Sequence, residues 1–138
     1  MNTRTRGFTL IELLVVIAII GLLASIITAS LSSTQAKARD ARRMEDLDAI
    51  KKALVLYSAD HAGYPLSVST TTLDGTDAIS QALVAANVIP AVPKDPKDPT
   101  YTYDYSTNVS ANSFIISFCL ETSSVRNYAQ GCGNNISI

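Results

Sequence analysis

Apolar residues form one continuous stretch near the start of the chain. Residues 8–27 contain only three polar side chains, those of Thr9, Glu12 and Ser25. An α-helix rises about 1.5 Å per residue, so a helix of this length would span about 30 Å, which is the thickness of the hydrocarbon core of a bilayer. The pattern therefore predicts a membrane-spanning helix.

After residue 30 the pattern becomes periodic, and apolar residues recur at steps of three or four on one helical face. They are Met44, Leu47, Ile50, Leu54 and Tyr57. This spacing predicts an amphipathic helix with a single buried stripe. Gly63 and Pro65 follow, and since glycine favours a helix C-terminus and proline cannot continue a helix, we expect the helix to end at about residue 62. One helix from residue 8 to residue 62 would be about 80 Å long.

The charged residues of this second half have the spacing of a solvated helix face. Arg42 and Asp46 stand four residues apart, as do Asp48 and Lys52. Such pairs contribute only about 0.2–0.5 kcal/mol each. We favour solvent exposure over specific contacts for these charges, and contacts with other chains are the alternative.

Between residues 66 and 99 the sequence predicts a loop, a short helix and an extended turn. The loop covers residues 66–77, and the helix runs from about 77 to 86 with Thr76 as its cap. Prolines then recur, and each disfavours helical backbone in the residue before it. We expect residues 94–98 to form an exposed turn.

Aromatic or apolar residues alternate with polar residues in two later segments, at 101–106 and 112–121. This alternation predicts two half-buried strands joined by a hairpin loop, and a third short strand is expected at 125–129. Their apolar faces would pack on the stripe of the long helix. The predicted fold class is therefore α+β, with a long N-terminal helix packed against a small antiparallel sheet.

Composition limits the possible functions. The chain has 138 residues, of which 47% are hydrophobic and 17% charged, and its net charge is −1. This length leaves room for one small domain beyond the span. There is no basic excess that would indicate a nucleic-acid surface, so no nucleic-acid partner is expected.

Candidate catalytic and metal-binding chemistry is sparse. His61 is the single histidine and stands beside the expected helix end, where a positive charge is favourable. The sequence shows no catalytic triad, phosphate-binding glycine loop or zinc-ligand spacing. We expect neither enzymatic activity nor a cofactor nor a metal.

The two cysteines, Cys119 and Cys132, most simply form one disulfide if the domain lies outside the cytoplasm. Closing a loop of this length is worth about 3 kcal/mol in the chain-entropy model.

Glu12 is the anomaly of the apolar stretch. A carboxylate in a spanning helix costs up to about 2.5–3.5 kcal/mol, depending on its depth. Because Glu12 lies only about one turn inside the stretch, its side chain can reach the headgroups. The alternative is that it pairs with a cation in a site of low dielectric constant.

The sequence Gly7-Phe8-Thr9-Leu10-Ile11-Glu12, followed by the apolar helix, resembles the N-terminus of type IV prepilins and type II secretion pseudopilins. In that family a membrane-embedded prepilin peptidase cuts after the glycine and methylates the new N-terminal residue. The resemblance implies cleavage between Gly7 and Phe8 and an N-methylated Phe8. It also implies that Glu12 meets the N-terminal amine of a neighbouring subunit during assembly.

The resemblance further implies a division into a leader at 1–7, a transmembrane and assembly helix at 8–29, and a globular pilin-like domain at 30–138 that includes the second half of the helix. Arg4 and Arg6 precede the span. Cations on this side place the N-terminus in the cytoplasm before processing and the C-terminal domain outside the cytoplasmic membrane.

The function implied is that of a structural subunit of a type IV pilus-like or type II secretion pseudopilus filament. Its implied partners are further copies of itself, minor pilins or pseudopilins, the prepilin peptidase, and an assembly platform with its ATPase. The resemblance does not decide between a secretion pseudopilus, a surface pilus and a DNA-uptake filament. The alternative is a single-span, membrane-anchored extracytoplasmic binding protein that does not polymerise. For the apolar segment itself, the alternative interpretation is an ordinary secretory signal peptide.

The best-known major pseudopilins bind calcium in a late acidic loop. After Asp104 this chain has only one carboxylate side chain, that of Glu121. Because calcium takes several oxygen ligands, usually including more than one carboxylate, we expect no calcium site there.

Overall fold

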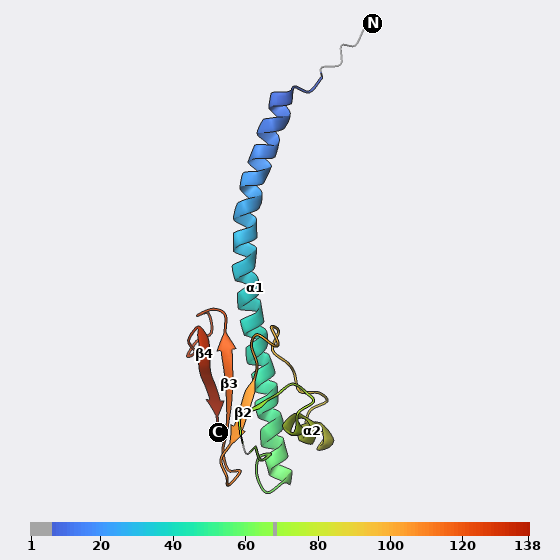
Figure 1. Ribbon diagram of the computed structural model, residues 1–138, viewed down its shortest axis with the longest axis vertical. Helices are drawn as coiled ribbons and strands as arrows, with labels where there is room; N and C mark the ends of the chain where they lie inside the picture. The colour runs from blue at the N-terminus through green and yellow to red at the C-terminus, as the bar shows by residue number, and fades with distance from the viewer. Residues whose placement is uncertain (1–6, 68) are drawn as a thin grey trace. The chain divides into compact units, whose positions relative to one another are not determined.

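The computed structural model of the chain describes residues 7–67 and 69–138, except for the side chain of Ala29 (Figure 1). Residues 1–6 of the expected leader, with both of its arginines, lie outside the described residues. The elements follow the order α1, β1, α2, β2, β3, β4. This is the α+β class predicted from the sequence, with a long N-terminal helix and a small antiparallel sheet.

The long helix α1 runs from Leu10 to Asp60, which confirms the predicted single helix. The chain divides into two compact units: the first ends at Gln35, and the second runs from Ala36 to Ile138. Continuous helix formation fits the sequence, since α1 contains no proline and only one glycine, Gly21.

In the first unit, the apolar side chains of α1 are exposed on every side of the helix. Their exposed fractions lie between 45% for Val16 and 81% for Leu10. By length and composition this part of α1 is apolar enough to cross a membrane. No other part of the chain covers these side chains within the described residues.

The second unit contains a four-stranded antiparallel sheet in the order β1-β2-β3-β4. The strands are β1 Thr71–Thr72, β2 Asp104–Thr107, β3 Phe114–Leu120 and β4 Gly131–Ser137. Each strand pairs with the next one along the chain, and Figure 1 shows β2, β3 and β4 beside one another. The predicted hairpin of two alternating strands corresponds to β2 and β3.

The core of this unit forms where the apolar stripe of α1 meets the sheet. Leu47, Ile50 and Leu54 are 0% exposed, and Met44 and Tyr57 pack at the edge of the same cluster. Tyr103, just before β2, and the apolar positions of the strands join this core: Tyr105, Phe114, Ile116, Phe118 and Leu120. Side chains of α2 and the loops around it add to it: Leu73, Ile79, Leu83, Ile89 and Val92. The predicted stripe is confirmed, and each fully buried Leu or Ile contributes about 1.5–3 kcal/mol.

The second helix, α2, spans Ala78–Ala85. Its N-cap is Asp77 and not Thr76, because the Asp77 carboxylate accepts a hydrogen bond from the backbone N–H of Ser80 at 2.8 Å. The backbone N–H and hydroxyl of Thr76 donate instead to Asp74, both at 2.7 Å. The predicted helix is thus confirmed and its predicted cap is wrong by one residue.

Two strand predictions are wrong. The expected loop at 66–77 contains the two-residue strand β1, which is too short to give an alternating pattern. The third strand lies at Gly131–Ser137 and not at 125–129, where Asn127 has a φ of 72° that an extended strand does not permit. The composition of β4 hides it, because glycine and asparagine are depleted in strands.

Gly63 lets the chain leave α1 and pass close to the hairpin loop. Its φ is +146°, and the backbone N–H of Tyr64 donates to the carbonyl of Ala111 at 2.9 Å. A Cβ at position 63 would lie 2.6 Å from that carbonyl oxygen. Both the backbone conformation and the lack of space therefore require glycine here.

We predict that Gly63→Ala destabilises the globular unit by about 1–3 kcal/mol, since the substitution adds conformational strain and forces two backbone segments apart. Chemical unfolding of the full chain in detergent, followed by the circular dichroism of the core tyrosines, measures the loss. Gly75→Ala is the matched control: its φ is also positive, at +82°, but the nearest atom to the new Cβ is 3.9 Å away. Equal losses for the two variants would contradict the role given to crowding.

Candidate functional site

At the first turn of α1, Thr9 and Glu12 are joined by hydrogen bonds in both directions. The backbone N–H and hydroxyl of Thr9 donate to Oε2 of Glu12, at 2.8 and 2.6 Å, and the N–H of Glu12 lies 3.3 Å from the Thr9 hydroxyl. This reciprocal arrangement is a capping box. Among the described residues, Oε1 of Glu12 accepts no hydrogen bond.

The structure places the sequence-predicted residues of this segment together at one helix end. Gly7 and Phe8 precede α1, and the Phe8 side chain is 76% exposed. Sequence analysis singled out Glu12 but missed Thr9 as its partner. The signal was present, because a threonine followed three residues later by a glutamate, ahead of an apolar run, is the pattern of a capping box.

The hydroxyl groups of the apolar helix are satisfied within the helix itself. Ser25 donates to the carbonyl of Leu22 at 2.7 Å, and Thr28 donates to that of Ala24 at 2.9 Å. In hydrocarbon, a hydroxyl without a hydrogen-bond partner would cost roughly several kcal/mol, because no water is present to bond it. These side chains are thus compatible with a lipid environment.

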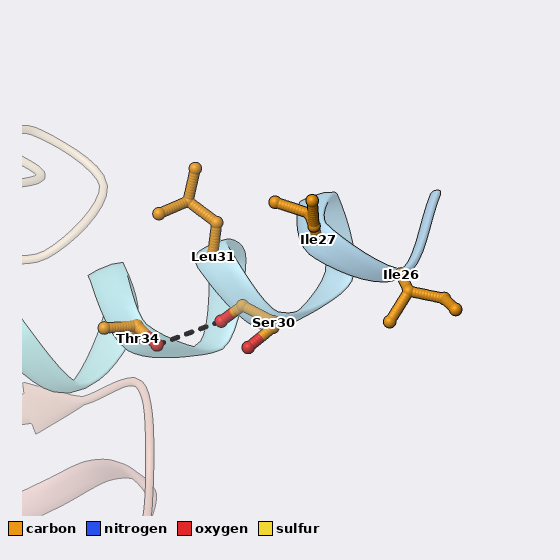
Figure 2. A pocket seen from close by; sticks show the side chains of 5 residues that line it. All are labelled: Ile26, Ile27, Ser30, Leu31 and Thr34. Atoms are coloured by element: carbon orange, nitrogen blue, oxygen red, sulfur yellow. Dashed lines mark hydrogen bonds between the residues drawn. The ribbon is translucent and has the colours of Figure 1, made fainter. Parts of the chain in front are cut away.

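A shallow groove lies on the surface of α1 towards the end of the first unit (Figure 2). It is lined by three apolar side chains, those of Ile26, Ile27 and Leu31, together with Ser30 and Thr34. The Thr34 hydroxyl donates to the carbonyl of Ser30 at 3.0 Å, as Figure 2 shows. The groove belongs to the helix surface and holds no charged group.

In the second unit, Arg43 of α1 is the centre of a buried ion network and its side chain is 0% exposed. Its Nε and Nη2 donate to the two carboxylate oxygens of Asp95, at 2.7 and 2.9 Å. Its Nη1 donates to Asp40 at 2.8 Å and to Glu121 at 2.9 Å. The guanidinium carbon also lies 5.1 Å from the ring centroid of Tyr101. Three segments that are distant in sequence therefore meet at one cation.

Asp40 fastens the end of β3 to α1. Its carboxylate accepts hydrogen bonds from the backbone N–H of Glu121 at 2.9 Å, from the backbone N–H of Thr122 at 2.8 Å and from the Thr122 hydroxyl at 2.6 Å. Burial alone would raise the pKa of Asp40, but these bonds, with the one from Arg43, lower it below its usual value.

Glu121 receives two further cations at the outer side of the network. Arg39 donates to both of its oxygens at 2.7 Å, and the Lys97 ammonium lies 3.0 Å from Oε2. The bonds from Arg39 are the main reason that the pKa of Glu121 lies well below its usual value, although burial acts against them. The carboxylate side chain is 9% exposed, whereas the Lys97 side chain is 43% exposed.

These contacts correct two sequence predictions. The charged face of α1 is not uniformly solvated, because Asp40 and Arg43 are fully buried. The expected exposed turn at 94–98 carries Asp95, which is 5% exposed and bound to Arg43. Helical periodicity could not show this, since the partners come from segments that only the folded chain brings together.

The remaining charge pairs of α1 follow the prediction of solvent exposure except at Asp46, whose side chain is only 13% exposed. Arg42 and Asp46 lie 4.0 Å apart, and Lys52 lies 2.6 Å from Asp48, with both basic side chains largely exposed. Asp46 also accepts a hydrogen bond from the hydroxyl of Tyr103 at 3.1 Å. Burial raises the pKa of Asp46 above its usual value.

Cys119 of β3 and Cys132 of β4 form a disulfide across neighbouring strands, the pairing expected from the sequence. His61 stacks on Tyr57 with 3.9 Å between ring centroids, and its Nδ1 lies 2.9 Å from the Tyr57 carbonyl. Within residues 7–67 and 69–138, no group of three or more His, Cys, Asp or Glu side chains is placed to hold a metal ion.

Comparison with known proteins gives one family model, described as the prokaryotic N-terminal methylation motif, which matches residues 2–28. The match contains the segment with Gly7, Phe8 and Glu12. No solved structure matches the chain significantly.

Curated relatives match a larger part of the chain. The type II secretion system core protein G of Vibrio cholerae is 32% identical over 108 residues, covering 72% of this chain and 70% of the relative. The protein of that name from Dickeya chrysanthemi is 34% identical, covering 71% of this chain and 56% of the relative. A type IV major pilin protein of Neisseria gonorrhoeae is 37% identical, covering 47% of this chain and 39% of the relative. The chain spans about half the length of several curated relatives, 54% and 53% in two further cases.

We predict that Arg43→Met destabilises the second unit by roughly 3–5 kcal/mol, because it leaves several carboxylates buried together without their cation. Unfolding by denaturant of the full chain in detergent measures the loss. Arg42→Met is the matched control: its side chain is 67% exposed, and the pair it makes with Asp46 is long. We expect a change below about 1 kcal/mol for the control. Similar losses in both variants would show that the network adds no more than a surface pair.

We further predict that stability falls with pH from about 4.5 downward. The ordinary pKa values of Asp40 and Glu121 are 3.8 and 4.5, and both are lowered in the folded chain. Their stabilising contribution is therefore complete above about pH 4.5 and is lost as the pH falls through the folded pKa values. The unfolding midpoint, measured between pH 7 and pH 2, tests this.

Glu121→Gln serves as the comparison for the pH series. This variant should start from a lower stability at neutral pH and lose less on acidification, because one titrating group is gone. An acid slope as steep as that of the unmodified chain would contradict the assignment to Glu121.

Proposed function

Because the chain belongs to the family of the type II secretion system core protein G, we propose that it is a structural subunit of a type IV pilus-like or type II secretion pseudopilus filament. The observation that carries this proposal is the first part of α1, where apolar side chains are exposed on all sides and a single carboxylate, Glu12, stands near the start. Such a helix is stable in lipid, or in a bundle of identical helices, but not in water.

We propose that processing separates residues 1–7 from the rest, with cleavage after Gly7 and methylation of the new N-terminus at Phe8. The family model matched at this segment supports the proposal. Cleavage creates a charged amine beside the apolar zone. A lone amine and a lone carboxylate are each costly in lipid, and each offsets the other when they are paired between two chains.

The geometry of the capping box suits this pairing. Thr9 occupies only Oε2 of Glu12, so Oε1 is left to accept a hydrogen bond from the amine of a neighbouring copy. The carboxylate keeps its orientation at the helix end while it binds the second chain. One misplaced subunit would leave both charges unpaired, so the pairing fixes the register of the filament as well as its stability.

In the proposed topology the span crosses the cytoplasmic membrane once, with the N-terminus in the cytoplasm before processing. A prepilin peptidase, an assembly platform with its ATPase, and minor pilins or pseudopilins are the proposed partners. We assign the chain no enzymatic role. The relatives that cover about 70% of the chain are named for type II secretion, which favours a pseudopilus over a surface pilus.

We predict that Glu12→Ala and Glu12→Leu leave a processed, stable membrane protein that enters filaments at least about tenfold less often. A tenfold change corresponds to about 1.4 kcal/mol, which is less than the cost of an unpaired charge in the apolar zone. The experiment coexpresses each variant with the assembly machinery, measures the N-terminus by intact mass, and quantifies sheared filaments.

Ser25→Ala is the matched control, because it removes another polar side chain of the apolar stretch, one whose hydroxyl is bound within its own helix. This control should assemble normally. A normal filament yield from the Glu12 variants would refute the pairing. If the unmodified chain keeps residues 1–7 and never enters filaments, the alternative is favoured, namely a membrane-anchored binding protein that does not polymerise.

A further inference from the structure

The last strand contributes little to the core of the second unit. Of the seven residues of β4, only Asn134 is buried, and Ile136 packs partly against the core cluster. The Asn134 side chain bonds only to its own neighbourhood, namely the backbone N–H and carbonyl of Ala129 and the carbonyl of Gly131. Apart from its backbone pairing with β3, β4 therefore has few contacts that would hold it in place.

The composition of β4 weakens it further. The strand reads Gly-Cys-Gly-Asn-Asn-Ile-Ser, and both of its glycines have a positive φ. Glycine and asparagine are unfavourable in strands, and β4 is an edge strand that pairs with β3 alone. A strand with so little burial is marginal without an additional constraint.

The segment between β3 and β4 is fixed at two places by different chemistry. At its start, Asp40 holds the backbone and hydroxyl of Thr122. At its far end, the disulfide joins Cys119 to Cys132, the second residue of β4. Between them, Tyr128 packs edge-on against Phe118 at 5.1 Å between ring centroids. Cys132 is exposed, so a thiol in solution can reach the disulfide.

We propose that the Cys119–Cys132 disulfide is a redox-controlled clamp on a detachable strand. When it is oxidised, β4 completes the four-stranded sheet. When it is reduced, β4 and the segment before it leave β3, while α1, α2, β2 and β3 stay folded over the core. The ion network is the reason that the detachment stops at Thr122, because Asp40 and Arg43 need no disulfide to hold the end of β3.

The chemical step is thiol–disulfide exchange. A dithiol reductant gives two electrons and two protons, the sulfur–sulfur bond between Cys119 and Cys132 breaks, two thiols form, and the reductant leaves as its own disulfide. Cytosolic reductants keep such cysteines reduced, whereas compartments outside the cytoplasm oxidise them. On the orientation proposed above, the fourth strand would be completed only after the globular unit has reached the oxidising side.

The test is hydrogen–deuterium exchange of the folded, unmodified full chain in detergent, before and after treatment with dithiothreitol. Complete reduction is verified by alkylation and mass. We expect the amides of Gly131–Ser137 to exchange on the order of a hundredfold faster after reduction, the factor that the chain-entropy model gives for opening a loop of this size. The amides of α1 around Leu47 and Ile50 should exchange at an unchanged rate.

Two variants complete the experiment. The double variant Cys119→Ser, Cys132→Ser should reproduce the exchange pattern of the reduced chain. Asn135→Thr, at an exposed position of β4, should slow the exchange of β4 in the reduced chain, because threonine favours strands. The proposal is overturned if the β4 amides stay protected after full reduction. It is equally overturned if α1 and β4 lose their protection together, since the disulfide would then support the whole unit and not one strand.

Discussion

An apolar helix surface that its own chain does not cover has to be covered by another molecule. This constraint governs the first part of α1, where every large apolar side chain is at least 45% exposed. The hydroxyls of Ser25 and Thr28 bond to carbonyls of the same helix, so lipid and neighbouring helices are both acceptable surroundings for them. Glu12 is the one acidic side chain in this part, and in the filament proposed above it pairs with the N-terminal amine of a neighbouring subunit.

In the second part of α1, the apolar side chains of the stripe are covered by other parts of the same chain. Its apolar stripe is covered by the sheet, and its buried arginine is covered by carboxylates from three segments. A buried ion network of this kind adds less net stability than an apolar core of equal volume, because desolvation offsets much of the attraction. Its effect here is geometric: Arg43 fixes where the loop with Asp95 and the end of β3 lie against the helix.

Sequence patterns predicted the features that repeat along the chain, and they failed where one contact decides the structure. The stripe with Leu47, Ile50 and Leu54 and the alternation in β3 are periodic, so local sequence was sufficient. The burial of Asp95 depends on Arg43, which is 52 residues away in the sequence. The residues around Asp95 therefore do not indicate that it is buried. For the N-terminal segment, the motif was sufficient to propose Gly7, Phe8 and Glu12 as cleavage and assembly residues, but it did not show which oxygen of Glu12 is bonded to Thr9.

The failure at β4 has a physical cause of the same kind. A strand of glycine and asparagine has no propensity of its own, so its position is set by its pairing with β3 and by the covalent link from Cys132. The second unit therefore combines a core that forms from apolar burial and ion pairing in any compartment with an edge that depends on oxidation. In the topology proposed above, the chain starts in a reducing compartment and works in an oxidising one, so the same forces would fold its core on both sides and only its outermost strand would respond to the difference.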